Sequence, residues 1–312
     1  MATTKAVGVT MFFNLKPLSD TTELTRSREF YEKNCVATLS INNPLVILCD
    51  SSTRAWIEPL RNSLSTAETQ YIEKNITEYD HYKVNFPLIV HNRKTSPTYQ
   101  HTDNRNTPSF LLTTTFKFHA LKMAAELIQD ATHYVWVDFG CQHVVWEAQT
   151  RLQAIFDNPR SKITMTYIHY RPSNDVKDMA MYLSKGGPCS LAATVFSIEK
   201  SYMNLFYTRC MSIFYEQLSK QVGHNEEQVL IYLYDRYPEM FNLVYGDYYS
   251  TVSNYHNVVR DYNTIKTCFI NTTIAAGRKD LAAVAAYNIM ESHNKGKIQL
   301  SKDELLFLNS LI

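Results

Sequence analysis

The sequence predicts an α/β protein with a mostly parallel central sheet flanked by helices. Short apolar runs of strand length recur along the chain, and segments with helical periodicity separate them. Two of these runs, residues 45–49 and 134–137, end at an aspartate, Asp50 and Asp138. Strand–helix–strand units join parallel strands through right-handed crossovers, so these observations together favour a Rossmann-related sheet.

The composition is that of a soluble globular protein. The chain has 312 residues, of which 45% are hydrophobic and 20% charged, and its 31 basic and 30 acidic side chains give a net charge of +1. This balance provides no basic surface for nucleic acid. No apolar stretch approaches the length of a membrane span. The six cysteines form no CxxC pair, and with no signal peptide recognised we expect a reducing, cytoplasmic location.

The amino-terminal half is expected to begin as a β-α-β unit. Residues 6–13 alternate as a first strand, residues 21–36 favour a helix, and residues 45–49 form a short buried strand. A loop at residues 51–53 and helical turns at 58–64 follow. Residues 65–108, rich in Thr, Asn, His, Tyr and Pro, predict a long, partly irregular excursion over the active face. Residues 110–130 then have a helical period.

The remaining elements continue the alternation. We expect strands at residues 132–138, 162–170, 191–198 and 241–245, and helices at 146–156, 199–223, 226–237, 273–287 and 303–310. Residues 1–272 therefore make one α/β domain, and residues 273–312 make a helical extension packed on it.

The segment 132–140 is a candidate ligand site, because an apolar strand ends there at Asp138 and Gly140. Ligands of open α/β sheets bind beyond the carboxyl ends of the strands, so Asp138 is a candidate to hold a metal or polar ligand. The alternative is an ordinary turn aspartate that caps the next segment.

Several enzyme classes are excluded by missing motifs. The run Val-Asp-Phe-Gly ending at Gly140 invites a protein-kinase interpretation, but no Gly-rich phosphate loop, V-A-I-K strand or H-R-D segment precedes it. Walker A, G-x-G-x-x-G and G-x-S-x-G motifs are also missing.

Five blocks in order give a family resemblance, over roughly residues 7–266. The chain resembles the HtrL/YibB family of proposed glycosyltransferases, and this implies a GT-A-type nucleotide-sugar fold. The blocks are residues 41–50 (INNPLVILCD), 116–117 (FK), 135–140 (VWVDFG), 225–230 (NEEQVL), and 237–248 (YPEMFNLVYGDY) with Asn254 and Tyr255.

The resemblance implies a divalent-metal site for Mn²⁺ or Mg²⁺. Asp138 occupies the place of the metal-binding acidic motif, although Gly140 stands where a second acid is usual. Asp247 or His256 is expected to supply a further ligand, although a lone histidine is more often not a ligand. The diphosphate would complete the oxygen shell that hard cations take.

The resemblance also assigns donor and acceptor residues. Gly186 and Gly187 match a glycine-rich loop that lets the backbone approach the sugar, although an ordinary turn explains them as well. Glu226 and Glu227 match an acidic pair at a helix start, where an acid acts as general base or orients the donor sugar. Simple helix capping is their alternative explanation.

Two further residues are expected to contact the donor. Asp50 ends a strand on the binding edge and is expected to contact the nucleotide ribose or base. Lys117 is expected to pair with the diphosphate, where a cation stabilises the developing charge of the leaving group. For Lys117 the alternative is a lysine on a solvated helix face.

These residues predict a glycosyltransferase that moves a sugar from a UDP- or GDP-sugar to a hydroxyl of a glycan or glycoconjugate. A second hypothesis is a non-catalytic sugar- or nucleotide-binding protein of the same fold, which the missing second acid at Gly140 motivates. A third is a metal-dependent phosphohydrolase, which would need more clustered Asp and His ligands than the sequence groups. Cleavage of p-nitrophenyl phosphate would distinguish the third from the others.

Overall fold

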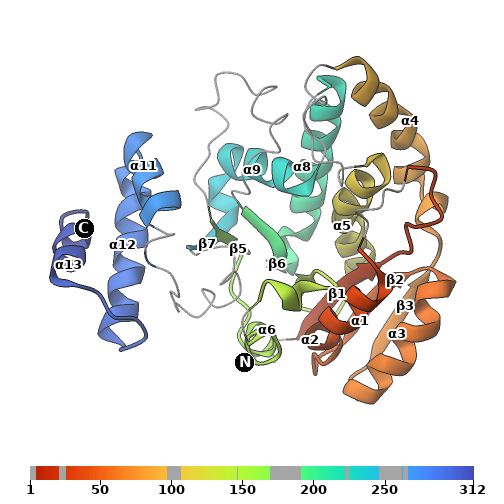
Figure 1. The fold of residues 1–312 in the computed structure, drawn as a ribbon, viewed down its shortest axis with the longest axis horizontal. Helices are drawn as coiled ribbons and strands as arrows, with labels where there is room; N and C mark the ends of the chain where they lie inside the picture. Colours follow the sequence, from red (N-terminus) through yellow and green to blue (C-terminus); the bar gives the residue numbers. More distant parts are fainter. Residues whose placement is uncertain are drawn as a thin grey trace.

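The structure is a computed structural model, and it describes residues 5–20, 26–96, 107–145, 147–168, 191–221, 225–245, 262 and 266–312. Its centre is a seven-stranded sheet with the strand order β3-β2-β1-β4-β6-β5-β7 (Figure 1). The strands are β1 (Ala6–Phe12), β2 (Leu45–Cys49), β3 (Thr69–Glu73), β4 (His133–Val137), β5 (Ile163–Tyr167), β6 (Leu191–Glu199) and β7 (Phe241–Tyr245).

The sheet is mostly parallel, as predicted. Strand β1 pairs in parallel with β2 and β4, β2 with β3, and β5 with β7, whereas β6 runs antiparallel to both β4 and β5. The carboxyl ends of β1, β2 and β4 therefore lie at one edge, which we call the carboxyl edge. The amino end of β6 reaches the same edge.

Helices cover both faces of the sheet (Figure 1). On one face lie α4 (Asp80–Thr95), α5 (Pro108–Leu127), α8 (Lys200–Ser219) and α9 (Glu226–Arg236). On the other lie α2 (Val36–Leu39), α3 (Ser51–Leu64) and α6 (Ala148–Asp157), with α1 (Arg28–Asn34) beside α2. Alternate residues of a strand enter opposite cores: Tyr134 and Trp136 belong to the α5 side, and Val135 and Val137 to the α6 side.

Short helical turns connect these elements. They are the 3₁₀ turns η1 (Ile76–Glu78), η3 (Cys141–His143) and η5 (Pro238–Met240). The helix α9 ends at Arg236, just before Pro238, as the sequence predicts.

The predicted irregular excursion over residues 65–108 is wrong for most of that segment, because β3, η1 and α4 lie within it. The helix α4 contains Pro87 and turns polar side chains inward, with His81, Asn85 and Asn92 all buried. An inward face of that kind has no apolar period to detect. Residues 97–106 lie outside the described part of the chain.

The predicted loop at residues 51–53 is also wrong, because α3 begins at Ser51. Asp50 forms a capping box with Thr53, which satisfies free N–H groups of the first turn and starts the helix directly after the strand. The predicted helix over residues 273–287 is divided into α11 (Asn271–Ala275) and α12 (Lys279–Asn294), and Gly277 between them has φ +75°. Such a positive φ suits glycine and ends a helix.

The carboxyl-terminal helices form one end of the molecule in Figure 1. They are α11, α12 and α13 (Lys302–Asn309), preceded by the π-helical segment η7 (Lys266–Ile270), whose Phe269 ring lies 5.0 Å from that of Tyr167 in β5. The proposed domain boundary between residues 272 and 273 stays a prediction, and α11 runs across it.

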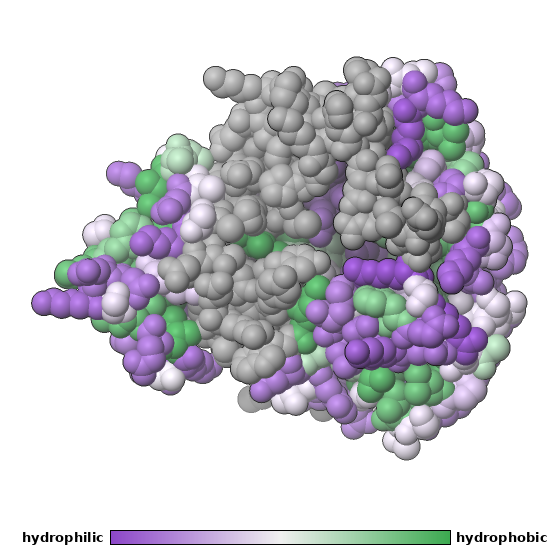
Figure 2. All heavy atoms as spheres, in the orientation of Figure 1, coloured by the Kyte–Doolittle hydropathy of each residue, from purple (hydrophilic) through white to green (hydrophobic). Residues whose placement is uncertain are grey.

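None of the helices in the described part of the chain is both long and apolar enough to cross a membrane. On the face drawn in Figure 2, hydrophobic and hydrophilic patches alternate, also over the carboxyl-terminal helices at the left. Exposed Val284 and Tyr287 on α12 contribute to the hydrophobic surface of that end.

Candidate functional site

A buried charged cluster lies at the carboxyl edge, and three separate elements build it. Lys117 comes from α5, Asp138 follows β4, and Glu226 is the first residue of α9. The ammonium Nζ of Lys117 lies 3.2 Å from Asp138 Oδ1 and 2.8 Å from Glu226 Oε1. The structure thus brings together three residues that the sequence proposed separately, and we call them the Lys–Asp–Glu cluster.

Lys117 is not on a solvated helix face. Its side chain is 3% exposed, and its Nζ also donates to the carbonyl oxygen of Ala193 in β6 at 3.2 Å. Burial alone would lower the pKa of Lys117, but the two carboxylates outweigh burial and raise it. The ammonium is therefore held positive and fixed in place between Asp138 and Glu226.

Asp138 is the most open member of the cluster, with 39% of its side chain exposed. Its Oδ1 accepts hydrogen bonds from Lys117 Nζ and, at 2.7 Å, from the indole N–H of Trp136. No described residue donates to Oδ2. The pKa of Asp138 is raised, because partial burial, with a contribution from Glu226, outweighs the opposing charge of Lys117. Among the described residues, one carboxylate oxygen is thus engaged and the other has no donor.

The structure separates the two neighbouring glutamates. Asn225 caps α9 and forms a capping box with Gln228, and this sets the direction of the first helical turn. Glu226 then points to Lys117 and has an 11% exposed side chain, whereas Glu227 is only partly buried and is not among the groups bonded to Lys117. Glu226 is therefore the member of the pair that belongs to the cluster.

Gly140 lies directly against an aromatic ring. A Cβ atom at this position would lie 3.1 Å from Cδ1 and 3.3 Å from Cε1 of Tyr31, closer than side chains ordinarily pack. With φ −101°, the residue needs no left-handed backbone, so the close approach is the reason for glycine. A second acid in place of Gly140 would have to displace Tyr31.

An aromatic group at the carboxyl edge was missed from the sequence. The ring of Phe12, at the end of β1, lies 4.5 Å from Tyr31 and stacks on Phe139 at 4.8 Å. Trp56 of α3 contacts both Phe12 and Phe139 edge-on. The sequence signal for this group was an aromatic residue at the end of each of two predicted strands, Phe12 and Phe139.

The contacts of Asp50 with the described residues are structural. Its Oδ1 accepts from the backbone N–H of Thr53 at 2.9 Å, and its Oδ2 accepts from that of Asn14 at 2.7 Å. The residue is 6% exposed, so it ties the loop after β1 to the start of α3. Its contact with a nucleotide stays a prediction.

The remaining predicted residues, Gly186, Gly187, Asp247 and His256, lie outside the described residues. Within the described part of the chain, no group of three or more His, Cys, Asp or Glu side chains is arranged to hold a metal ion. The described residues offer one open carboxylate oxygen, Asp138 Oδ2. A carboxylate oxygen is a suitable ligand for a hard cation, but a single one does not complete the coordination shell.

Comparison with protein families identifies the chain. The model of the HtrL_YibB family, described as a bacterial protein of unknown function, matches residues 5–257. The chain belongs to this family, which confirms the resemblance drawn from its motifs. Comparison with curated proteins gave no match.

Three of the solved structures with a distant likeness to this chain are transferases or synthases by their names. Mouse xyloside xylosyltransferase 1 in its apo form is 11% identical, with 77% of this chain and 84% of that chain covered and a TM-score of 0.42. A glycosyltransferase involved in the glycosylation of the major capsid of PBCV-1 is 10% identical, with 77% and 80% covered and a TM-score of 0.35. The 4-diphosphocytidyl-2C-methyl-D-erythritol synthase of Anaerococcus prevotii is 9% identical, with 86% and 99% covered and a TM-score of 0.38. At these values the likeness carries no argument about function.

Proposed function

We propose that the protein is a glycosyltransferase that moves a sugar from a nucleotide-diphosphate donor to a hydroxyl acceptor. The observation that supports this most is the Lys–Asp–Glu cluster at the carboxyl edge of the sheet. Open α/β sheets bind ligands at this edge, and a buried charged cluster there is expensive to maintain without a use.

Glu226 is the proposed general base. The acceptor hydroxyl oxygen forms a bond to the anomeric carbon, the bond from that carbon to the diphosphate oxygen breaks, and the hydroxyl proton passes to the carboxylate. Lys117 holds Glu226 Oε1 at 2.8 Å and so fixes the direction of the carboxylate. Lys117 is accordingly a positioning residue in this proposal, rather than the direct diphosphate contact that the sequence suggested.

Charge balance supports a divalent cation, which we propose as Mn²⁺ or Mg²⁺. Lys117 contributes one positive charge against the two carboxylates of Asp138 and Glu226, and a diphosphate adds further negative charge. Asp138 Oδ2 would be a protein ligand, and Asp247 and His256 remain proposed ligands. A bound ion would neutralise the charge of the leaving diphosphate.

The test is a panel of UDP- and GDP-sugars with and without Mn²⁺, read by donor hydrolysis and by thermal stabilisation. We expect at least one donor to raise the melting temperature and to be turned over. Asp138→Asn should lose both effects while it keeps the wild-type melting temperature without donor. No response to any donor, with Asp138→Asn indistinguishable from wild type, would overturn the proposal.

A non-catalytic binding protein is the second candidate, and one observation favours it. Glu226 Oε1 is already engaged by Lys117 and the residue is 8% exposed, so little of its carboxylate is open to an acceptor hydroxyl. Donor-induced thermal stabilisation without any turnover would support this candidate. Turnover that is lost in Glu226→Gln would eliminate it.

A further inference from the structure

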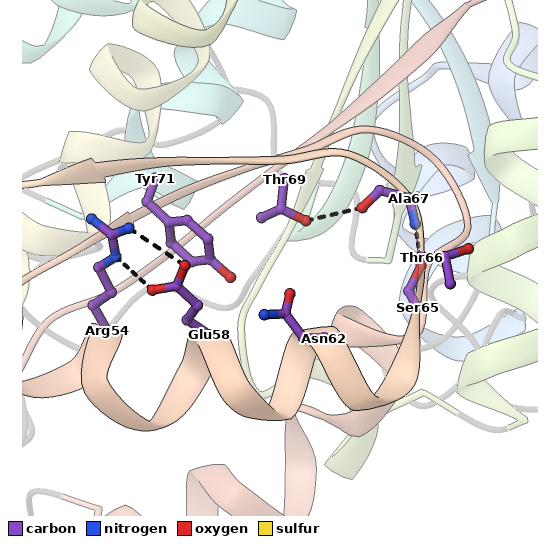
Figure 3. A pocket seen from close by; sticks show the side chains of 8 residues that line it. All are labelled: Arg54, Glu58, Asn62, Ser65, Thr66, Ala67, Thr69 and Tyr71. Carbon is purple, nitrogen blue, oxygen red and sulfur yellow. Dashed lines mark hydrogen bonds and ion pairs between the residues drawn. The ribbon is translucent and has the colours of Figure 1, made fainter.

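A second polar site lies at the opposite end of the sheet from β7, between α3 and the edge strand β3. It is a groove of about 460 Å³, and we call it the α3–β3 groove (Figure 3). Its walls include Arg54, Glu58 and Asn62 from α3, and Tyr71 from β3. The strand order places β3 three strands from β4, roughly 14 Å across the sheet, so the groove is separate from the Lys–Asp–Glu cluster.

The hydroxyl of Tyr71 is the feature that indicates a ligand site. Its oxygen is buried, and it has no hydrogen-bond partner among the described residues. Figure 3 shows this hydroxyl directed into the same space as the side chain of Asn62. Burial, with a contribution from Glu58, raises the pKa of Tyr71 to about 12, so the phenol keeps its proton and remains a donor.

Ion pairs and hydrogen bonds hold parts of both ends of the groove in place. Arg54 pairs with Glu58 at 2.9 Å and with Glu73 at 3.0 Å, and its guanidinium lies 4.8 Å from the centre of the Tyr71 ring. At the other end, buried Arg61 donates to Thr69 Oγ1 at 3.0 Å. A prearranged site loses little conformational freedom on binding.

The chemistry of the groove selects a neutral hydroxyl-rich ligand. Tyr71 supplies a donor, Asn62 supplies a donor and an acceptor, and the Glu58 carboxylate supplies acceptors for hydroxyl groups. The one cation that lines the groove, Arg54, is neutralised by its two glutamates, and buried Arg61 behind the wall is engaged by Thr69 and by carbonyl oxygens, so neither is open to a phosphate. The volume lies in the range of small-ligand pockets.

We propose that the α3–β3 groove binds a neutral monosaccharide unit through Tyr71, Asn62 and Glu58. Sugar hydroxyls both donate and accept, which matches the mixed set of partners on these walls. Binding here does not require the transfer reaction proposed above, and the measurement is of binding alone.

The experiment is saturation-transfer NMR on the full chain with named probes. These are methyl α-glucoside, methyl α-mannoside, methyl α-galactoside and N-acetylglucosamine, with glucuronate as the charged counterpart. We expect at least one neutral probe to bind, and Tyr71→Phe and Asn62→Leu each to weaken it by about tenfold. The matched control is Tyr287→Phe, at an exposed tyrosine of α12, which should leave binding unchanged.

Three results would overturn the proposal: no signal from any neutral probe, a signal that persists in both groove variants, or tighter binding of glucuronate than of every neutral probe. The melting temperature of Tyr71→Phe should not fall, because the lost hydroxyl has no described partner, so a loss of binding would not reflect unfolding. A comparison with maltotriose distinguishes the source of the sugar. If maltotriose binds more tightly than the monosaccharides, the natural ligand is a glycan chain. If it binds equally, the ligand is a free sugar or a chain end. Both results support the proposal.

Discussion

In the part of the chain that the structure describes, two lysine or arginine side chains are buried, and they are satisfied in opposite ways. Lys117 is 2% exposed and lies between two carboxylates at the carboxyl edge of the sheet. Arg61 of α3 is fully buried and instead donates to backbone carbonyl oxygens, those of Leu39 and Ile41 at 2.6 Å each. It also reaches the carbonyl oxygens of Asn43 and Ala67.

The difference separates a structural cation from one in a candidate site. Burial lowers the pKa of Arg61, and its planar guanidinium matches several fixed carbonyl groups, so it ties together the loops beneath α3. The pKa of Lys117 is raised by two acids, and one of them, Asp138, has a 39% exposed side chain with an oxygen to which no described residue donates. Neutral partners thus complete the Arg61 site, whereas the Lys–Asp–Glu cluster keeps one carboxylate oxygen without a donor among the described residues.

The largest expected effect comes from Lys117→Met. Removal of the ammonium leaves Glu226 as a buried carboxylate without its partner, so the free energy of unfolding should fall by about 3–5 kcal/mol. Donor turnover should be lost as well. Urea denaturation and donor hydrolysis measure the two effects.

A double variant sharpens this prediction. In Lys117→Met with Glu226→Gln no buried charge is left unpaired at this contact, so about 2 kcal/mol of stability should return without recovery of turnover. Recovery of turnover in the double variant would contradict a functional role for the charged pair.

Arg61→Met should destabilise the protein by about 3 kcal/mol, because it leaves buried carbonyl oxygens without donors. The variant should keep the wild-type kcat at a temperature where it remains folded, since Arg61 lies apart from the Lys–Asp–Glu cluster. Urea denaturation gives the stability. A kcat reduced as strongly as that of Lys117→Met would remove the distinction between the two cations.

His81 and His119 form a third buried group, in which the bases contact no carboxylate. Their pKa values can be compared with that of Lys117, which contacts two carboxylates. His81 bonds to Thr115 Oγ1 at 3.0 Å and lies 3.2 Å from His119, which contacts the Tyr207 hydroxyl. Burial lowers the pKa of His81 to about 3 and that of His119 to about 4, so both are neutral in the folded protein.

These depressed pKa values make stability depend on pH in a definite direction. Histidines in the unfolded chain bind protons below about pH 6.5, so the unfolded state gains protons that the folded state does not. Stability should be full near neutral pH and fall by about 1 kcal/mol per histidine between about pH 7 and 5.5. Denaturation at both pH values measures this, and His119→Gln should reduce the difference by about 1 kcal/mol. An unchanged difference in His119→Gln would contradict the assignment.

The last expected effect is steric and concerns Gly140. In Gly140→Ala the new Cβ would press on the Tyr31 ring at 3.1 Å, at a cost of about 1–2 kcal/mol. Combination with Tyr31→Leu should relieve part of this cost, and a double-mutant cycle of denaturation energies measures the coupling. Simple additivity would show that the ring is not the obstacle.

Much of the fold could be predicted from local sequence. The strand at residues 45–49 matches β2 because a strand buried on both faces reads as a continuous apolar run. The helix α4 escaped prediction because its inward side chains include His81 and Asn85. Arg61, in the last turn of α3, has the position of an ordinary helix-end cation, and nothing local reveals its burial.

The candidate site was predictable in membership but not in arrangement. Lys117, Asp138 and Glu226 were each proposed at the level of the sequence, yet their contacts join residues 21 and 109 positions apart. Only the packing of α5 and α9 against β4 and β6 establishes those contacts. The same packing brings Glu226 rather than Glu227 to Lys117. The sequence could not distinguish the two glutamates because they are neighbours.

The most direct test of the central claim is the kcat for donor turnover in Glu226→Gln beside its matched control Glu227→Gln. If the Lys–Asp–Glu cluster is the reaction centre, Glu226→Gln should lower kcat by at least about 100-fold, and Glu227→Gln should stay within about twofold of wild type. Equal kcat values in the two variants, or a loss confined to Glu227→Gln, would contradict the account.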